Sequence, residues 1–292
     1  MADNLNGKYF HNKGFDQKKL QEGVLGFLPK HQPGYAPTAA ECALTLINRL
    51  GADVRVTDLR YMAYMLATAC HEAREIKKFL LPKVVKGKVL VDAKTKQPIM
   101  GERHLWTLFN PIDEAGQGKG RDYFEAVKVQ ALEDGALVTE KDGDQFKINA
   151  QGVIQRGRGL SGPTAVGSPS GGAPSKKYQD AAGDEHQYYG RGLVQITWWN
   201  GYAKSGVDFG FGLELLLNPE RVKDYNVAYE IMVQGMTTGG GYANGKKCSQ
   251  FFTAAQTDYV SARAMVNGSD KAQAIADLAI AFEAILLDAR LQ

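Results

Sequence analysis

Residues 58–81, DLRYMAYMLATACHEAREIKKFLL, carry the clearest helical pattern in the chain. Apolar and small side chains recur there at the i, i+3, i+4, i+7 spacing of a buried helix face. They are Leu59, Met62, Ala63, Leu66, Ala67 and Cys70. Glu72 follows Met65 and Ala69 and therefore lies on the shoulder of this apolar stripe. Partial burial there disfavours the ionised carboxyl group and raises its pKa, as a general acid working near neutral pH requires.

Two other interpretations of Glu72 stay open. Its side chain is equally suited to a structural ion pair with His71, Arg74 or another basic neighbour. On a helix that runs through residue 81, His71 and Glu75 share a face, which suggests a zinc peptidase, although such motifs place a second histidine where Glu75 stands. A third zinc ligand would have to be one of the remaining histidines, which stand at no recognisable spacing. They are His11, His31, His104 and His186.

Helical periodicity recurs towards both ends of the chain, and we expect these ends to be mostly helical. The segments are residues 39–50 in the first part and residues 226–236, 258–266 and 270–291 in the last. Thr57 or Asp58 can cap the helix that contains Glu72, and residues 267–269 supply a turn and a capping side chain for the final helix.

The middle of the chain has a different composition. Short β-type runs separated by polar turns occupy residues 83–98 and 136–154, and they predict small hairpins. Residues 157–183 are rich in Gly, Ser, Pro and Ala and bury too little apolar surface to order well. We therefore expect one mainly helical domain over residues 1–292, with a β-like insert at about 83–100 and a flexible insert at about 136–186.

Composition excludes several classes of protein. The chain has 292 residues, of which 44% are hydrophobic and 23% charged, an ordinary globular mixture. The formal net charge of +3 is too small to indicate nucleic-acid binding, although a mildly basic surface suits an anionic polymer. Three widely spaced cysteines, Cys42, Cys70 and Cys248, predict free thiols. The first 14 residues lack a secretory signal and no apolar run reaches spanning length. We therefore expect synthesis in the cytoplasm and no membrane insertion.

A second informative stretch is YYGRGLVQITWWNGY at residues 188–202. Its glycines allow tight backbone geometry. Gln195 and Thr197 project to the same side if the segment is extended, because side chains alternate along a strand. Aromatic rings beside amide and hydroxyl groups are typical of a sugar-binding cleft, although any single ring is more often part of the core.

His71-Glu72 at a helix end, followed by the Tyr-Tyr-Gly-Arg-Gly-x-x-Gln-x-Thr-Trp string, resembles the family nineteen glycoside hydrolases. This family includes plant-type chitinases and phage endolysins. Residues 263–268, RAMVNG, are similar to its Arg-x-(Ile/Val)-Asn-Gly segment, and residues 110–114, NPIDE, are similar to the Pro-Ile-x-Glu of its phage and bacterial members. The resemblance extends over residues 58–287 and leaves residues 1–38 and both inserts unexplained.

The resemblance implies a lysozyme-like fold, with two helical lobes around a cleft and small β-hairpin elements. It implies that Glu72 is the general acid, that Glu114 is the base that activates water, and that Thr197 helps to hold this water. The other substrate-binding residues would be Tyr189, Gln195, Asn200 and Asn267, where Asn200 substitutes for a family asparagine replaced here by Gly201. The inserts leave rivals for the role of Glu114, namely Glu75, Glu102, Asp113 and Glu125.

The activity implied is hydrolysis of β-1,4 bonds between N-acetylated amino sugars with inversion, without a metal or an organic cofactor. An inverting pair of carboxyl groups stands roughly 6.5 to 9.5 Å apart. Secreted plant chitinases are cross-linked by disulfides, so the odd cysteine count and the lack of a signal favour a phage-type endolysin that degrades peptidoglycan. We expect a monomer that reaches the bacterial cell wall after release or as a virion component. A chitinase and a non-catalytic wall-binding virion protein remain alternatives.

Overall fold

The computed structural model describes residues 6–10, 14–121, 123, 185–212 and 214–291, and six short strands between residues 127 and 179. Of the short strands, β6 (Val127–Lys128) pairs with β7 (Thr139–Glu140), β8 (Lys147–Ile148) with β9 (Ile154–Gln155), and β10 (Thr164–Val166) with β11 (Lys177–Gln179), which also pairs with β12 (Glu185–His186). Most of the insert that we expected to be flexible, at 136–186, lies outside the described residues, and so does Glu125.

The described part of the chain is mainly helical, as predicted. The α-helices are α1 (Asn6–Tyr9), α2 (Gln17–His31), α3 (Ala39–Ala52), α4 (Leu59–Glu72), α5 (Trp199–Asp208), α6 (Glu214–Leu217), α7 (Tyr225–Thr238) and α8 (Ala272–Ala289). Four short 3₁₀ helices follow α6 and α7, namely η1 (Pro219–Lys223), η2 (Gly241–Ala243), η3 (Cys248–Gln250) and η4 (Ser261–Met265). None of the helices in the described ranges is both long and apolar enough to cross a bilayer.

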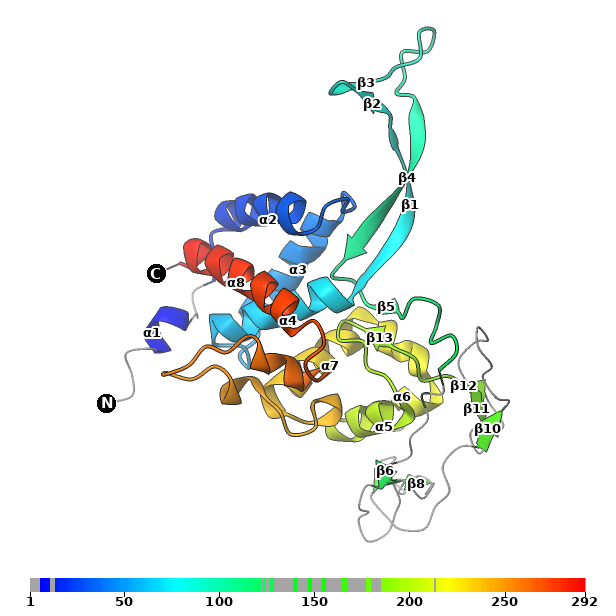
Figure 1. The fold of residues 1–292 in the computed structure, drawn as a ribbon, viewed down its shortest axis with the longest axis vertical. Coiled ribbons are helices and arrows are strands. Elements are labelled where there is room, and N and C mark those ends of the chain that lie inside the picture. The colour runs from blue at the N-terminus through cyan, green and yellow to red at the C-terminus, as the bar shows by residue number, and fades with distance from the viewer. Residues whose placement is uncertain are drawn as a thin grey trace.

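Helix α4 is the centre of the core. It packs against α3, α7 and α8 (Figure 1), and its side chains from Leu59 to Cys70 are almost all buried. The carboxylate of Asp58 caps its start by accepting the N–H of Arg60 at 2.8 Å, as predicted. Its last residue is Glu72, so the carboxyl group of interest stands where the central helix leaves the core.

Two predicted helices are shorter than their patterns indicated. The helix expected over residues 58–81 ends at Glu72, and residues 74–82 form a strand instead. Pairing along a second long strand outweighs the local helical pattern there, because β-structure depends strongly on its neighbours. The helix expected over residues 258–266 is replaced by η4 over its second half.

The β-like insert is longer than the expected 83–100. Strands β1 (Arg74–Pro82) and β4 (Met100–Leu108) pair antiparallel along their whole length, from Arg74 opposite Leu108 to Pro82 opposite Met100. Beyond them, β2 (Val84–Val85) and β3 (Lys88–Val89) pair across a two-residue turn. We call residues 74–108 the arm, because they project from the helical body (Figure 1).

A very short two-stranded sheet follows the arm. Strand β5 (Ile112–Asp113) pairs antiparallel with β13 (Arg191–Gly192), so that Asp113 lies opposite Arg191. This pairing joins the two sequence strings that contain Glu114 and Gln195. It thereby fixes residues distant in the chain beside one another, close to the end of α4.

Candidate active site

A cleft of about 720 Å³ lies between the end of α4 and the β5–β13 pair. Five of the seven predicted site residues line it, namely Glu72, Glu114, Gln195, Thr197 and Asn267. An adjoining hollow of about 250 Å³ shares Gln195, Thr197 and Asn267 with the cleft and adds Asn200. The structure therefore brings six of the predicted residues to one continuous surface.

Glu72 is held in a buried and cationic setting. Its side chain is only 18% exposed, and its Oε1 lies 2.6 Å from Nη1 of Arg263, which is itself 2% exposed. The Nε of Arg263 donates to the backbone oxygen of Asp270 at 2.8 Å, which fixes the guanidinium. Burial raises the pKa of Glu72, and the charge of Arg263 opposes this rise without cancelling it.

His71 lines the cleft beside Glu72 but adds no charge to it near neutral pH. Burial, and next the nearby Arg74, lower the pKa of His71 to about 4. The imidazole is therefore neutral over the range in which Glu72 is expected to work.

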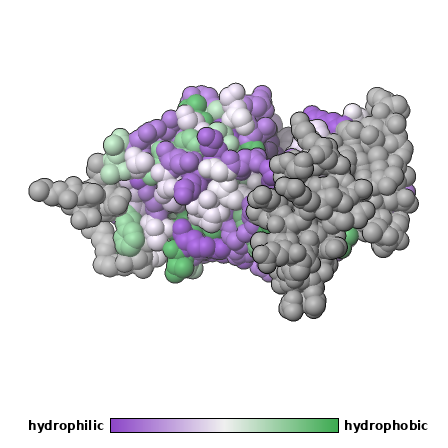
Figure 2. Space-filling model, turned by 90° about the horizontal axis from the view of Figure 1, so that it is seen from below, coloured by the Kyte–Doolittle hydropathy of each residue, from purple (hydrophilic) through white to green (hydrophobic). Residues whose placement is uncertain are grey.

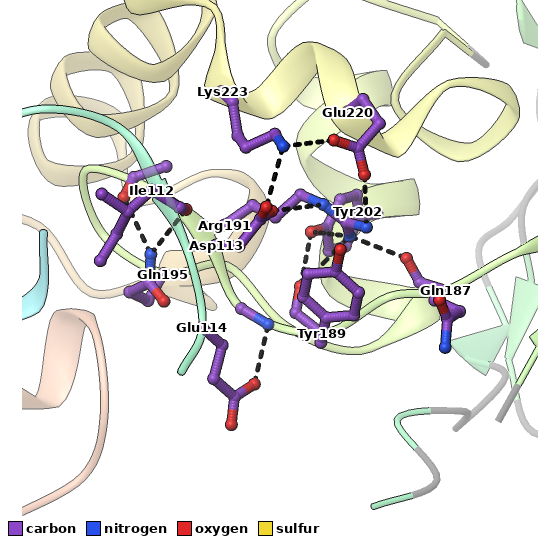
Figure 3. Close-up of polar contacts among 12 residues, drawn as sticks. Ile112, Asp113, Glu114, Gln187, Tyr189, Arg191, Gln195, Tyr202, Glu220 and Lys223 are labelled. Atoms are coloured by element: carbon purple, nitrogen blue, oxygen red, sulfur yellow. Dashed lines mark hydrogen bonds and ion pairs between the residues drawn. The ribbon is translucent and has the colours of Figure 1, made fainter. Parts of the chain in front are cut away.

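Glu114 is surrounded by hydrogen-bond donors. The hydroxyl of Tyr123 lies 2.7 Å from both carboxylate oxygens. The N–H of Gly190 donates to Oε2 of Glu114 at 3.0 Å, and Figure 3 shows this hydrogen bond to the Glu114 carboxylate. Arg121 lies farther away, with Nη1 at 3.7 Å from Oε1. An ionised carboxylate, which only accepts hydrogen bonds, satisfies all these groups at once. Burial, and next the hydrogen bond with Glu114, raise the pKa of Tyr123 to about 12, so its hydroxyl stays a donor.

The short sheet behind Glu114 is fastened by an ionic network. Asp113 pairs with Nζ of Lys223 at 2.8 Å and with Nε of Arg191 at 3.3 Å. Arg191 also pairs with Glu220 at 2.9 Å and donates to the hydroxyl of Tyr202 at 2.9 Å (Figure 3). These contacts engage Asp113 on the side away from the cleft, so it is no longer a rival to Glu114.

Tyr189, which was predicted to bind substrate, does not line the cleft or the adjoining hollow. Its side chain is 3% exposed, and the guanidinium of Arg191 stacks over its ring at 3.6 Å from the centroid. The ring therefore helps to bury the cation that fastens β5 to β13.

Gly190 is the point at which three predicted residues converge. A Cβ atom placed on Gly190 would lie 2.9 Å from Oε1 of Gln195, 3.3 Å from Cβ of Glu114 and 3.3 Å from Cγ2 of Thr197. Only a residue without a side chain allows the three to approach this closely.

The extended segment expected around Gln195 and Thr197 is not observed. Gln195 has a φ of 53° and Trp198 a φ of 70°, so the chain turns at both residues. The amide nitrogen of Gln195 donates to the backbone oxygens of Ile112 and Gly192 at 3.2 and 3.0 Å. A turn held by these bonds, and not the alternation of a strand, places Gln195 and Thr197 on the cleft.

Two other rivals to Glu114, namely Glu75 and Glu102, lie away from the cleft. Glu75 stands on β1 beside Lys77, and Glu102 stands on β4, 58% exposed and 2.6 Å from Nζ of Lys78. Because α4 ends before Glu75, the helix face that the zinc-peptidase interpretation required does not exist. In the described residues, no three His, Cys, Asp or Glu side chains are grouped as metal ligands.

Two features of the cleft were not predicted from the sequence, namely which aromatic rings face it and which groups contact its two carboxyl groups. Trp198 is 39% exposed and meets the ring of Tyr123 edge-on, with centroids 5.4 Å apart, and Trp106 enters from the base of the arm. Trp198 belongs to the string already singled out, so its exposure was the missing information. Arg263 begins the RAMVNG string already singled out, but no local pattern pairs it with Glu72, and Tyr123 carries no local signal, because each meets its carboxyl group only through the tertiary fold.

Comparison with models of known families, with curated proteins and with solved structures gives no match to this chain. We therefore base the functional proposal on the residues and geometry of the cleft.

Proposed function

We propose that this protein is a lysozyme-like glycoside hydrolase that cleaves β-1,4 bonds between N-acetylated amino sugars, with peptidoglycan as substrate. The observation that carries the proposal is that one cleft holds two carboxyl groups in contrasting surroundings. Glu72 is buried and has a raised pKa, whereas Glu114 accepts hydrogen bonds from Tyr123 and Gly190. Hydrolases that use an acid and a base require such a contrast.

The two carboxyl groups divide the reaction between them. Glu72 keeps its proton to higher pH than an exposed glutamate, and it donates this proton to the oxygen of the departing sugar. Glu114 is ionised and takes a proton from the attacking water. Thr197, which approaches Glu114 across Gly190, holds that water. The anomeric carbon is attacked from the face opposite the leaving group, and the configuration inverts.

The remaining lining residues suit a chain of acetylated sugars. The exposed ring of Trp198 and the ring of Trp106 offer flat apolar surfaces to sugar faces. Gln195 and Asn267 supply amide groups beside them, and Asn200 extends this polar surface into the adjoining hollow. Two groups of helices would form the lobes of a lysozyme-like fold around this cleft.

The test compares Glu72→Gln and Glu114→Gln with the wild type in two assays. One measures the clearing of outer-membrane-permeabilised bacteria, and the other measures the cleavage of N-acetylglucosamine oligomers. Each variant should lose about 10²- to 10⁴-fold in turnover and keep its binding of oligomers, because the change removes a proton-transfer group at constant volume. Glu102→Gln, on the exposed arm, is the matched control and should behave like the wild type.

Substantial activity in Glu72→Gln would remove the proposed acid. Activity on oligomers without release of peptidoglycan fragments would favour a chitinase. Binding without cleavage in the wild type would favour a wall-binding protein. Proton magnetic resonance of the first product gives its anomeric configuration, and retention would exclude Glu114 as the base that activates water.

A further inference from the structure

Exposed large hydrophobic side chains of the described residues are concentrated in the arm. Nine of the seventeen exposed large hydrophobic side chains in the described ranges belong to residues 74–108. Seven of the nine lie at its far end, namely Val84, Val85, Val89, Leu90, Val91, Ile99 and Met100. On the face of the body opposite the arm, outside the grey atoms, hydrophilic and intermediate residues dominate (Figure 2). Concentrated exposed apolar surface indicates a binding surface.

The arm also concentrates the positive charge of the protein. Residues 74–108 contain nine Lys and Arg residues and three acidic ones, a formal charge of +6, whereas the whole chain carries +3. The remainder of the chain is therefore net negative. The far end of the arm contributes Lys83, Lys86, Lys88, Lys94 and Lys96 to this excess, opposed only by Asp92.

Every residue at the far end of the arm, residues 83–100, is exposed, and this end combines a tight turn with a neighbouring hollow. Lys86 and Gly87, with φ of 49° and 75°, form a tight turn that presents two lysines beside two valine-containing strands. A hollow of about 950 Å³ beside the turn combines apolar walls, including Leu80, with two cations, Lys83 and Arg103, and one carboxylate, Glu102. An isolated two-stranded ribbon is marginally stable in water, so a covering surface would stabilise it.

We propose that the far end of the arm docks on the surface of an anionic lipid bilayer. Such a surface offers negative headgroups to the lysines and an acyl boundary to the valines and Met100, and a peripheral protein uses both. An anionic polymer would match the lysines but leave the apolar side chains in water. A second chain paired along the open strand edges would bring two segments of charge +6 together. The arm docks without spanning the bilayer, and this inference does not rest on the proposed hydrolase activity.

Co-sedimentation of the full chain with vesicles tests the proposal. Vesicles of phosphatidylcholine with phosphatidylglycerol should bind the wild type, and vesicles of phosphatidylcholine alone should bind it far more weakly. Lys86→Gln with Lys88→Gln should weaken binding about 30-fold, roughly fivefold for each lysine. Val85→Ser with Val89→Ser should weaken it at least about tenfold, because less apolar surface enters the interface.

Matched controls come from the helical body. Lys30→Gln with Lys246→Gln removes two exposed lysines, and Val54→Ser with Val260→Ser removes two valines that are 88% and 43% exposed. Neither control pair should change binding. Equal binding to both kinds of vesicle, equal loss in arm and control variants, or an arm-dependent dimer that does not bind vesicles would each overturn the proposal. If an arm variant misfolds, the difference in wild-type binding between the two kinds of vesicle still tests the proposal.

Discussion

The replacement Gly190→Ala tests the geometry of the candidate active site most directly. The added methyl group would lie 2.9 Å from Oε1 of Gln195 and 3.3 Å from carbon atoms of Glu114 and Thr197. The end of a long side chain normally moves away from such a contact at little cost. Here the amide nitrogen of Gln195 is tied to the backbone oxygens of Ile112 and Gly192, so movement of the amide breaks bonds.

The expected cost follows from these contacts. Breaking the two hydrogen bonds of Gln195 costs about 1 to 3 kcal/mol at roughly 0.5 to 1.5 kcal/mol each. If Gln195 stays, Glu114 and Thr197 must move instead, and overpacking costs about the same amount. In the first case the amide of Gln195 is displaced from the cleft surface, and in the second the positions of the proposed base and its water change. A displacement approaching about 1 Å in a catalytic site costs roughly 10²-fold in rate.

Chemical unfolding and turnover of N-acetylglucosamine oligomers should both be measured on Gly190→Ala. Gly26→Ala is the matched control, because a Cβ at that exposed position in α2 meets no atom within 4 Å. It should keep full turnover and gain about 0.5 to 1 kcal/mol from its helical position. If Gly190→Ala kept both its stability and its turnover, Gly190 would not control the spacing of Glu114, Gln195 and Thr197.

Three further changes probe the surroundings of the carboxyl groups. Arg263→Met should move the alkaline limb of the pH–activity profile to higher pH, because the cation that opposes the raised pKa of Glu72 is lost. The same change should lower the free energy of unfolding by on the order of 3 kcal/mol in chemical denaturation. Arg263→Lys should restore part of both effects, and an alkaline limb that stays in place would contradict the pairing of Arg263 with Glu72. Tyr123→Phe should lower turnover by about tenfold or more with little change in substrate binding, as measured by kcat and KM, whereas Tyr188→Phe, whose hydroxyl bonds Leu216 away from the cleft, should not. His71 has a pKa lowered from 6.5 to about 4, so the unfolded state binds more protons between these values and stability falls as the solution is acidified. His71→Gln should reduce this loss between pH 6.5 and about 4, and denaturation curves identical to the wild type over that range would show that His71 does not titrate as described.

Local periodicity and capping chemistry were enough to predict four of the eight α-helices in the described residues, whereas α1, α2, α5 and α6 were not predicted. The apolar stripe of α4 and the Asp58 cap place the start of that helix and the position of Glu72 on it. The patterns also predict α3, α7 and α8 to within a few residues. These elements depend on interactions between residues close in sequence, which a single chain reveals.

The end of α4 was not predictable in the same way. Residues 74–82 continue a helical pattern, but they pair over nine positions with a strand that begins at Met100. Such pairing adds hydrogen bonds between residues distant in the chain, and local propensity contains no record of it. The error mattered, because the zinc-peptidase alternative needed His71 and Glu75 on one continuous helix.

For the candidate site too, the identity of most lining residues was predictable from the sequence, whereas their contacts were not. The family resemblance implied that Glu72, Glu114, Gln195, Thr197 and Asn267 act in one site, and the fold places these five residues on one cleft. Their physical state depends on groups that no local pattern connects to them. Arg263 reaches Glu72 through η4, and Tyr123 reaches Glu114 through the chain that leaves β5. The contrast between the surroundings of the two carboxyl groups, on which the proposed mechanism depends, is thus a product of tertiary structure.

The position of the arm connects the two proposals without making either depend on the other. Its first strand begins two residues after Glu72, and its second strand ends shortly before β5 and Glu114. Arg74 and Trp106, at its base, line the cleft, and the guanidinium of Arg74 stands over the ring of Trp106 at 5.3 Å. The arm is therefore the covalent link between the segment that holds the proposed acid and the segment that holds the proposed base. A surface that binds the far end of the arm restricts the orientation of the cleft relative to that surface, because the nine-residue pairing of β1 with β4 resists independent movement of its two ends.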